Sequence, residues 1–214
     1  MTSIFVLIGL ALLIHFGRQH LANKHWRAPA GEVFKGELLA LGDNLVCLPD
    51  RSHIEPDALA KTTLVCFPGF LEDMRYFLEV HKDTPARLII INNGNYQNPF
   101  DQQPASAPSW FVQPPQPLGT IAHDANCLNQ VLEHMCGSEK IIVHGHSRGG
   151  AVALEAGRQQ PQLVKNIDAL LEAAVVPQGR LAGNLEKKLK PVGFYLAPFI
   201  YVLMRRLPEA RRLK

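Results

Sequence analysis

Short apolar runs alternate with helix-like segments through the middle of the chain. The apolar runs, each of strand length, cover residues 62–67, 87–91 and 141–144. Segments compatible with helices follow them at residues 71–80, 120–135 and about 148–159. Continuous apolar runs are typical of strands buried on both faces of a sheet, and their alternation with helices is typical of parallel sheets. The pattern therefore predicts an α/β fold, with a mostly parallel sheet and helices on both of its faces.

The segments around this alternation add a hairpin, a long loop and one more strand. Residues 32–48 contain two strand-like runs around Gly42-Asp43-Asn44, which predicts an antiparallel N-terminal hairpin. Residues 92–119 are irregular and rich in Asn, Gln and Pro, and loops of this length in compact domains are usually functional. Residues 166–177 suit a further strand, although residues 170–174 also suit a helix.

The most informative motif is Gly145-His146-Ser147-Arg148-Gly149, which joins an apolar run to a helix-like segment. A G-x-S-x-G sequence in this context predicts a sharp strand-to-helix turn that projects the serine hydroxyl. Strand and helix then approach so closely that the positions two before and two after the serine must lack a side chain. The helix N-terminus directs free N–H groups toward the place where an oxyanion would form. Because no G-K-[ST] sequence follows the glycines, a phosphate-binding loop is disfavoured.

Several of these features share one edge of the predicted sheet. Phe70, the loop 92–119 and Ser147 all follow the carboxyl ends of predicted strands. In open α/β sheets, ligands bind outside the carboxyl ends of the strands. We therefore expect the functional site at this edge.

The succession of strand, Pro68-Gly69-Phe70, helix, strand, long loop, helix and G-H-S-R-G-G resembles the α/β-hydrolase superfamily, particularly its lipase and esterase-like members. The resemblance covers residues 32–178, and the serine motif is its most specific part. It implies that Ser147 is the nucleophile and that the backbone N–H of Arg148 is one oxyanion donor. Pro68-Gly69-Phe70 stands where the family has its H-G-x motif, so the Phe70 N–H is the implied second donor.

The same resemblance implies an acid and then a histidine downstream of the nucleophile. The chain has no histidine after His146, which predicts an α/β-hydrolase-like domain that is C-terminally incomplete, whether as a truncated product, a fragment or a degenerate enzyme. Among the upstream histidines, His123 beside Asp124 is the best-placed candidate base. His146 is expected to point away from Ser147, and His144 is expected to be a packing residue of the strand.

Two functions of different classes follow from this interpretation. The first is a serine hydrolase that cleaves a carboxylic ester or thioester with an apolar acyl part, in a small molecule or a lipid. The alternative is a catalytically incomplete α/β-hydrolase-like protein that binds a membrane or a partner. The intact serine motif favours the first, and the missing downstream histidine favours the second, because a serine without a base is a poor nucleophile.

The N-terminal residues 1–17 are largely apolar, and the following residues 18–31 form a basic linker that includes Arg18, Lys24 and Arg27. The apolar run is short for a membrane span of about 20 residues, and no side-chain cation precedes it as in a signal peptide. We expect an uncleaved membrane anchor with the body facing the cytoplasm, because cations flanking a span stay on that side. A cleaved signal and a buried core helix are the alternatives.

The C-terminal residues 180–214 combine apolar and basic character. They hold nine Lys or Arg and two Glu. Residues 191–204 are apolar and aromatic and are interrupted by Pro198. We interpret 180–214 as a lid or interfacial segment that packs over the pocket or contacts lipid head groups. Residues 32–179 then form the hydrolase-like core.

Composition narrows the remaining possibilities. The 214 residues, 47% of them apolar and with net charge +3, fit one domain with a sizeable core. Basic and aromatic residues do not interleave, which argues against a nucleic-acid partner. The four cysteines lack the spacing of a metal site, and His144-x-His146 has no further ligand close by in the sequence. We therefore predict no metal and no cofactor, and the oligomeric state stays open.

Overall fold

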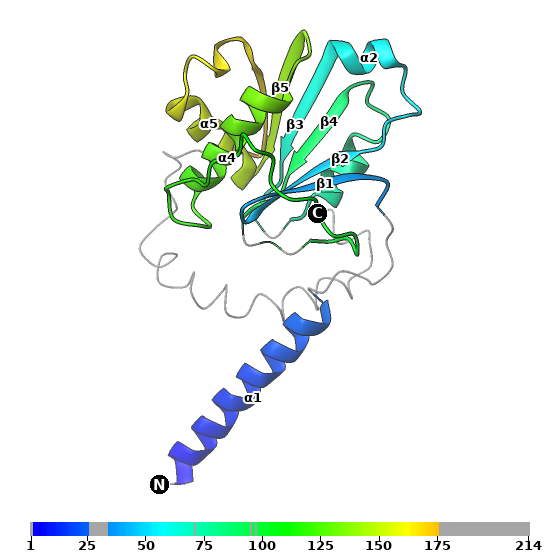
Figure 1. Ribbon diagram of the computed structural model, residues 1–214. Coiled ribbons are helices and arrows are strands. Elements are labelled where there is room, and N and C mark those ends of the chain that lie inside the picture. Colours follow the sequence, from blue (N-terminus) through cyan, green and yellow to red (C-terminus); the bar gives the residue numbers. More distant parts are fainter. Residues whose placement is uncertain (1, 26–33, 71, 95, 97, 176–214) are drawn as a thin grey trace. The chain divides into compact units, whose positions relative to one another are not determined.

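A computed structural model describes residues 2–25, 34–70, 72–94, 96 and 98–175 of the chain (Figure 1). The chain divides into two compact units, residues 31–179 and residues 1–30 with 180–214. The proposed lid or interfacial segment at 180–214 lies outside the described residues, and so do residues 26–31 of the basic linker.

The described part of the smaller unit is a single helix, α1 (Thr2–His25). It continues beyond residue 17, where the apolar segment ends in the sequence. Judged by length and hydropathy together, none of the described helices meets the requirements of a membrane span. The membrane anchor and its orientation stay predictions.

The larger unit is built on a mixed sheet of six strands in the order β1-β2-β4-β3-β5-β6 (Figure 1). The strands are β1 (Gly36–Leu41), β2 (Asn44–Pro49), β3 (Thr62–Phe67), β4 (Arg87–Ile91), β5 (Lys140–His146) and β6 (Asp168–Glu172). β1 and β2 form the predicted antiparallel hairpin, and β2 is also antiparallel to β4. The pairs β3–β4, β3–β5 and β5–β6 are parallel. The mostly parallel α/β sheet and its antiparallel start are confirmed.

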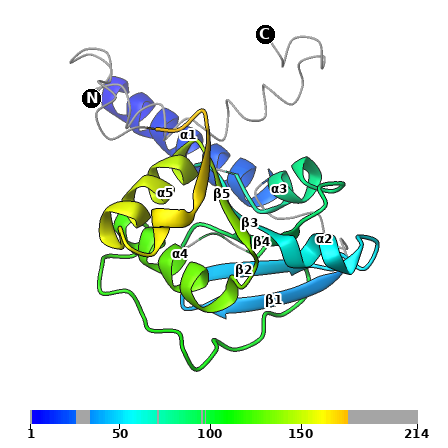
Figure 2. The ribbon, with the colours of Figure 1, turned by 90° about the horizontal axis from the view of Figure 1, so that it is seen from above.

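Helices cover both faces of this sheet. The helices of this unit are α2 (Pro56–Lys61), α3 (Arg75–Val80), α4 (Ile121–Met135), α5 (Arg148–Gln159) and the 3-10 turn η1 (Val164–Asn166). Leu128 of α4 and Val152 of α5 join one buried cluster with Val65 of β3. Phe77 of α3 joins a second buried cluster with Cys66 of the same strand. Figure 2 shows the result, with α4 and α5 on one side of the sheet and α3 on the other.

Two local predictions need correction, and one short helix was not predicted. The helix expected over 71–80 begins only at Arg75, and Glu72 stands before it with another role described below. The segment at 168–172 is the strand β6, so the helical alternative for 170–174 is wrong over its first residues. The short helix α2 was not predicted, because its six residues bury no side chain and therefore leave no apolar pattern.

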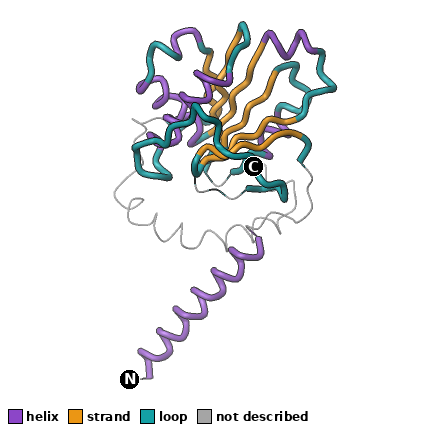
Figure 3. The backbone as a smooth tube through the Cα atoms, in the orientation of Figure 1, coloured by secondary structure: helices purple, strands orange, loops and turns teal. Residues whose placement is uncertain are grey.

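The long loop between β4 and α4 is hydrogen-bonded to other elements of the fold, which its sequence did not indicate. Figure 3 shows its described part as loop throughout. Ala105 exchanges backbone hydrogen bonds with β1, at 2.9 Å to Ala40 and 2.7 Å to Leu38. Farther along, Gln130 of α4 holds both backbone groups of Val112 at 2.8 Å. The middle of the loop thus contacts β1 and α4, whereas its two ends, at Asn93 and Gly119, reach the Arg148 side chain beside Ser147.

Candidate active site

Ser147 lies in the turn between β5 and α5 in a strained backbone conformation. Its φ is 49° and its ψ is −110°, a region that non-glycine residues rarely occupy. Backbone hydrogen bonds hold this conformation on both sides. The Ser147 N–H donates to the Glu172 carbonyl at 2.8 Å, and the Ser147 carbonyl accepts from Val175 at 3.0 Å. Strain of this kind persists only where the surroundings fix it, and it is typical of functional sites.

The glycines around Ser147 are required by close backbone contacts. A Cβ on Gly149 would lie 1.9 Å from the Phe67 carbonyl oxygen, and a Cβ on Gly145 would lie 2.5 Å from the Gly149 carbonyl oxygen. A Cβ on Gly150 would overlap the Ala174 side chain at 2.4 Å. The end of β3, the turn and the start of α5 are therefore packed backbone to backbone. This is the arrangement that a nucleophile elbow needs in an α/β-hydrolase-like fold.

The turn after β3 lies directly beside the serine. A Cβ built on Gly69 would stand 3.1 Å from the Ser147 Cβ. The next residue, Phe70, is half exposed. The turn that carries Phe70 is therefore adjacent to the nucleophile candidate, as a second oxyanion donor requires. The roles of the Phe70 and Arg148 N–H groups as oxyanion donors stay predictions.

Glu72 connects this turn to the elbow, a role that the sequence did not reveal. One carboxylate oxygen, Oε2, accepts from the Gly69 N–H at 2.8 Å and contacts His146 Nδ1 at 2.6 Å. The His146 ring also stacks on Tyr76 of α3, with 5.1 Å between ring centroids. The sequence predicted a helix over residues 71–80, and nothing in that pattern indicates that Glu72 lies close to His146.

The side chain of Arg148 ties the elbow to α4 and to the start of the long loop. Its Nη1 forms an ion pair with the fully buried Asp124 Oδ2 at 2.7 Å and also contacts Asn93 Oδ1. The second Asp124 oxygen accepts from Asn44 at 2.8 Å and from the Gly94 N–H at 3.2 Å. The buried carboxylate thus fixes the guanidinium immediately after the nucleophile candidate.

A chain of polar side chains lies on the α3 side of the elbow. Glu172 accepts from the Tyr76 hydroxyl at 2.9 Å and contacts His144 Nε2 at 3.1 Å. His144 Nδ1 in turn lies 2.9 Å from His81 Nε2. Burial raises the pKa of Tyr76 to about 12, and the hydrogen bond to Glu172 adds to the shift. Burial also lowers the pKa of both His144 and His81, so both rings are neutral near pH 7.

None of the candidate histidines is hydrogen-bonded to Ser147 as a catalytic base would be. Within the described residues, no histidine forms a hydrogen bond with the Ser147 hydroxyl. His146 is engaged by Glu72, and His144 is buried in the strand as expected. His123 is 1% exposed, and its Nδ1 lies 3.5 Å from Asp124 Oδ1. His123 Nε2 has no partner among the described residues, and its proposed role as base stays untested.

Comparison with known proteins finds solved structures whose folds are similar to that of this chain. Neither a protein-family model nor a curated protein matches the sequence. The thioesterase domain of the curacin biosynthetic pathway is 16% identical over 78% of this chain and 54% of its own, with a TM-score of 0.48. The type II thioesterase of the yersiniabactin NRPS/PKS pathway is 15% identical over 81% and 62%, with a TM-score of 0.48. The peroxisomal α/β-hydrolase Lpx1 of Saccharomyces cerevisiae is 17% identical over 72% and 44%, with a TM-score of 0.42.

This chain therefore spans about half the length of the solved structures that it matches, at 44–62% of their chains. Because identity is low and the TM-scores lie below 0.5, the likeness does not identify a substrate.

Proposed function

We propose that this chain is a serine hydrolase that cleaves a carboxylic ester or thioester with an apolar acyl part. The observation that carries the proposal is the positive φ of Ser147 in a turn whose flanking glycines allow no side chain. A protein keeps a strained non-glycine residue where its side chain is needed. The exposed Phe70 ring, on the turn beside Ser147, offers an apolar surface to the acyl group.

In the proposed reaction, the Ser147 hydroxyl attacks the acyl carbonyl carbon and loses its proton to a base. The Phe70 and Arg148 N–H groups hold the oxyanion, and the N-terminus of α5 contributes its positive dipole end. Collapse of the tetrahedral intermediate expels the alcohol or thiol, which takes up the proton. Water then attacks the acyl-serine, and the acid leaves with Ser147 restored.

The first test is turnover of short-chain p-nitrophenyl esters and acyl thioesters by the purified chain. We expect turnover above the background rate and its loss in Ser147→Ala, because the nucleophile is removed. Ser106→Ala, at an exposed position of the long loop, is the matched control and should keep the wild-type rate. Unchanged turnover in Ser147→Ala would refute the proposal.

A second candidate function is favoured by one observation. Because no described histidine contacts the Ser147 hydroxyl, the chain also fits a non-catalytic α/β-hydrolase-like protein that binds a membrane or a partner. A fluorophosphonate probe separates the two functions. Labelling of Ser147 in the folded chain supports the hydrolase, whereas a folded chain that stays unlabelled and turns over no ester supports the binding protein.

Glu72 should influence catalysis only by holding the Gly69–Phe70 turn in place beside Ser147. Glu72→Ala removes the oxygen that joins the Gly69 N–H to His146, so the turn with the proposed Phe70 donor loses its fixed position relative to the elbow. We expect kcat to fall about 10- to 100-fold with little change in KM, since a displaced oxyanion donor acts mainly on the transition state.

The matched control for Glu72→Ala is Glu79→Ala in α3, which loses an exposed ion pair with Lys82. It should leave kcat and KM unchanged. A Glu72→Ala enzyme with wild-type kcat, or with only KM altered, would contradict the positioning role.

A further inference from the structure

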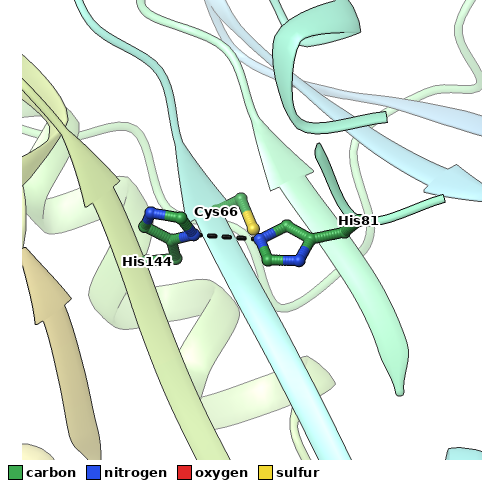
Figure 4. A group of neighbouring side chains, drawn as sticks. All are labelled: Cys66, His81 and His144. Atoms are coloured by element: carbon green, nitrogen blue, oxygen red, sulfur yellow. Dashed lines mark hydrogen bonds between the residues drawn. The ribbon is translucent and has the colours of Figure 1, made fainter. Parts of the chain in front are cut away.

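Three potential metal ligands from distant parts of the sequence meet on the α3 side of the sheet. They are Cys66 of β3, His144 of β5 and His81 at the end of α3 (Figure 4). Their donor atoms all lie within 4.8 Å of one another, and His81 Nε2 is 2.9 Å from His144 Nδ1. Figure 4 shows the Cys66 sulfur beside the same pair of nitrogens. The sequence predicted no metal, because no further ligand stands close to His144-x-His146 along the chain.

The backbone fixes this juxtaposition. Cys66 and His144 are direct register partners on adjacent parallel strands, so their side chains leave the sheet on the same face. Phe77 of α3 packs edge-on against His144, with 4.9 Å between ring centroids, and lies parallel to His81 at 6.0 Å. The cluster is buried, with exposures of 0% for Cys66, 9% for His81 and 4% for His144. Because these three side chains are already held in place, they lose little conformational entropy when a ligand binds.

The outer nitrogen of each imidazole already has a hydrogen-bonding partner. His144 Nε2 lies 3.1 Å from Glu172 Oε2, and His81 Nδ1 lies 3.1 Å from the Thr84 hydroxyl. The Glu172 carboxylate holds the His144 tautomer whose Nδ1 carries a lone pair, and the Thr84 hydroxyl is placed to accept from His81 Nδ1 once a metal occupies Nε2. Acceptors in these places are the usual second shell of a metal-bound histidine. Tyr76 donates to Glu172 and so fixes the orientation of that carboxylate.

We propose that Cys66 Sγ, His81 Nε2 and His144 Nδ1 bind a divalent transition-metal cation of the zinc class. One thiolate and two imidazoles suit such a borderline-soft cation and not Mg²⁺ or Ca²⁺, which prefer oxygen ligands. Around tetrahedral zinc, donor atoms are separated by about 3.5 Å. Small side-chain movements would reach this geometry, because the two ring nitrogens start 2.9 Å apart and all three donor atoms lie within 4.8 Å of one another. This inference does not depend on the proposed hydrolase activity.

The proton balance of binding can be written out. Without metal, one N–H between the two rings is shared in the His81–His144 hydrogen bond. When the metal binds, His81 takes the tautomer that carries its proton on Nδ1 and donates it to Thr84, whose hydroxyl serves as donor or acceptor. The Cys66 thiol releases its proton, so one proton leaves the protein for each cation bound.

The test is a titration of the full chain, reduced and freed of metal, with Co²⁺ alone. We expect saturation at one Co²⁺ per chain, a thiolate-to-cobalt charge-transfer band in the near ultraviolet, and intense visible bands typical of tetrahedral cobalt. Equimolar Zn²⁺ should abolish these bands. A folded wild-type chain that shows no thiolate band would overturn the proposal.

Variants locate the site. Cys66→Ser should remove the charge-transfer band, and His81→Gln and His144→Gln should each weaken Co²⁺ binding at least 100-fold. Cys127→Ser is the matched control, because Cys127 is also buried and its sulfur donates to Asn44 at 3.1 Å outside the cluster. A band that persists in Cys66→Ser, or one that disappears in Cys127→Ser while the fold is retained, would contradict the assignment. Circular dichroism establishes that each variant is folded, and the wild-type titration decides the proposal if a variant is not.

Discussion

Replacing Gly149 with alanine is expected to destroy the elbow and to destabilise the whole larger unit. The new methyl group would lie 1.9 Å from the Phe67 carbonyl oxygen. This obstacle is the backbone of a central strand, which cannot rotate away as a side chain can. The clash must separate β3 from α5, and we expect a loss of unfolding free energy of about 3 kcal/mol or more. Urea unfolding measures this loss, and Ser147 labelling by a fluorophosphonate should disappear with it.

The same substitution on the same helix provides the control. Gly157 lies farther along α5, and a Cβ there would approach nothing closer than Val164 Cγ2 at 3.4 Å. Gly157→Ala should therefore leave the unfolding free energy unchanged or raise it by up to about 1 kcal/mol, because alanine favours helix. Equal stability of Gly149→Ala and Gly157→Ala would show that the contact between β3 and α5 is not as close as described.

Replacing Asp124 with asparagine is expected to cost about 3 kcal/mol of unfolding free energy, since it leaves a largely buried guanidinium without its counter-charge. Asp124 is fully buried, and the side chain of its partner Arg148 is 15% exposed. Asparagine can still accept from Asn44 and Gly94. The change therefore isolates the ion pair from the other hydrogen bonds of this residue.

A control and a double variant complete this experiment. Glu133→Gln removes a carboxylate from the exposed face of α4 and should alter stability by less than about 0.5 kcal/mol. The double variant Asp124→Asn with Arg148→Gln should recover part of the loss, because it no longer buries an unpaired charge. Should Asp124→Asn be as stable as Glu133→Gln, the ion pair contributes nothing to the fold.

Much of the architecture could be predicted because its determinants are local. The strands β3, β4 and β5 are continuous apolar runs, and burial on both faces of a sheet requires that composition. Thr120 caps α4 through its side chain, which accepts from the His123 N–H at 3.2 Å, so its start is readable from the sequence. The glycines at 145 and 149 could be predicted from the geometry that a projecting serine demands.

Apart from the helix α2, which buries no side chain, the predictions that failed concern residues whose partners are distant in the sequence. Glu72 lies 74 positions from His146, to which it is bonded. The long loop has no regular sequence pattern, and its position is set by contacts with β1 and α4. It could therefore not be placed from the sequence.

By itself, the sequence determined the alternating α/β architecture and the strained turn at Ser147, since apolar runs and side-chain-free positions are constraints within one segment. Only the tertiary structure decided which polar groups surround that turn. Cys66 and His144 became neighbours through the pairing of β3 with β5, and His81 joined them because α3 packs on that face of the sheet. The sequence specifies the chemistry of each side chain, but the distances between side chains arise from how strands pair and helices pack.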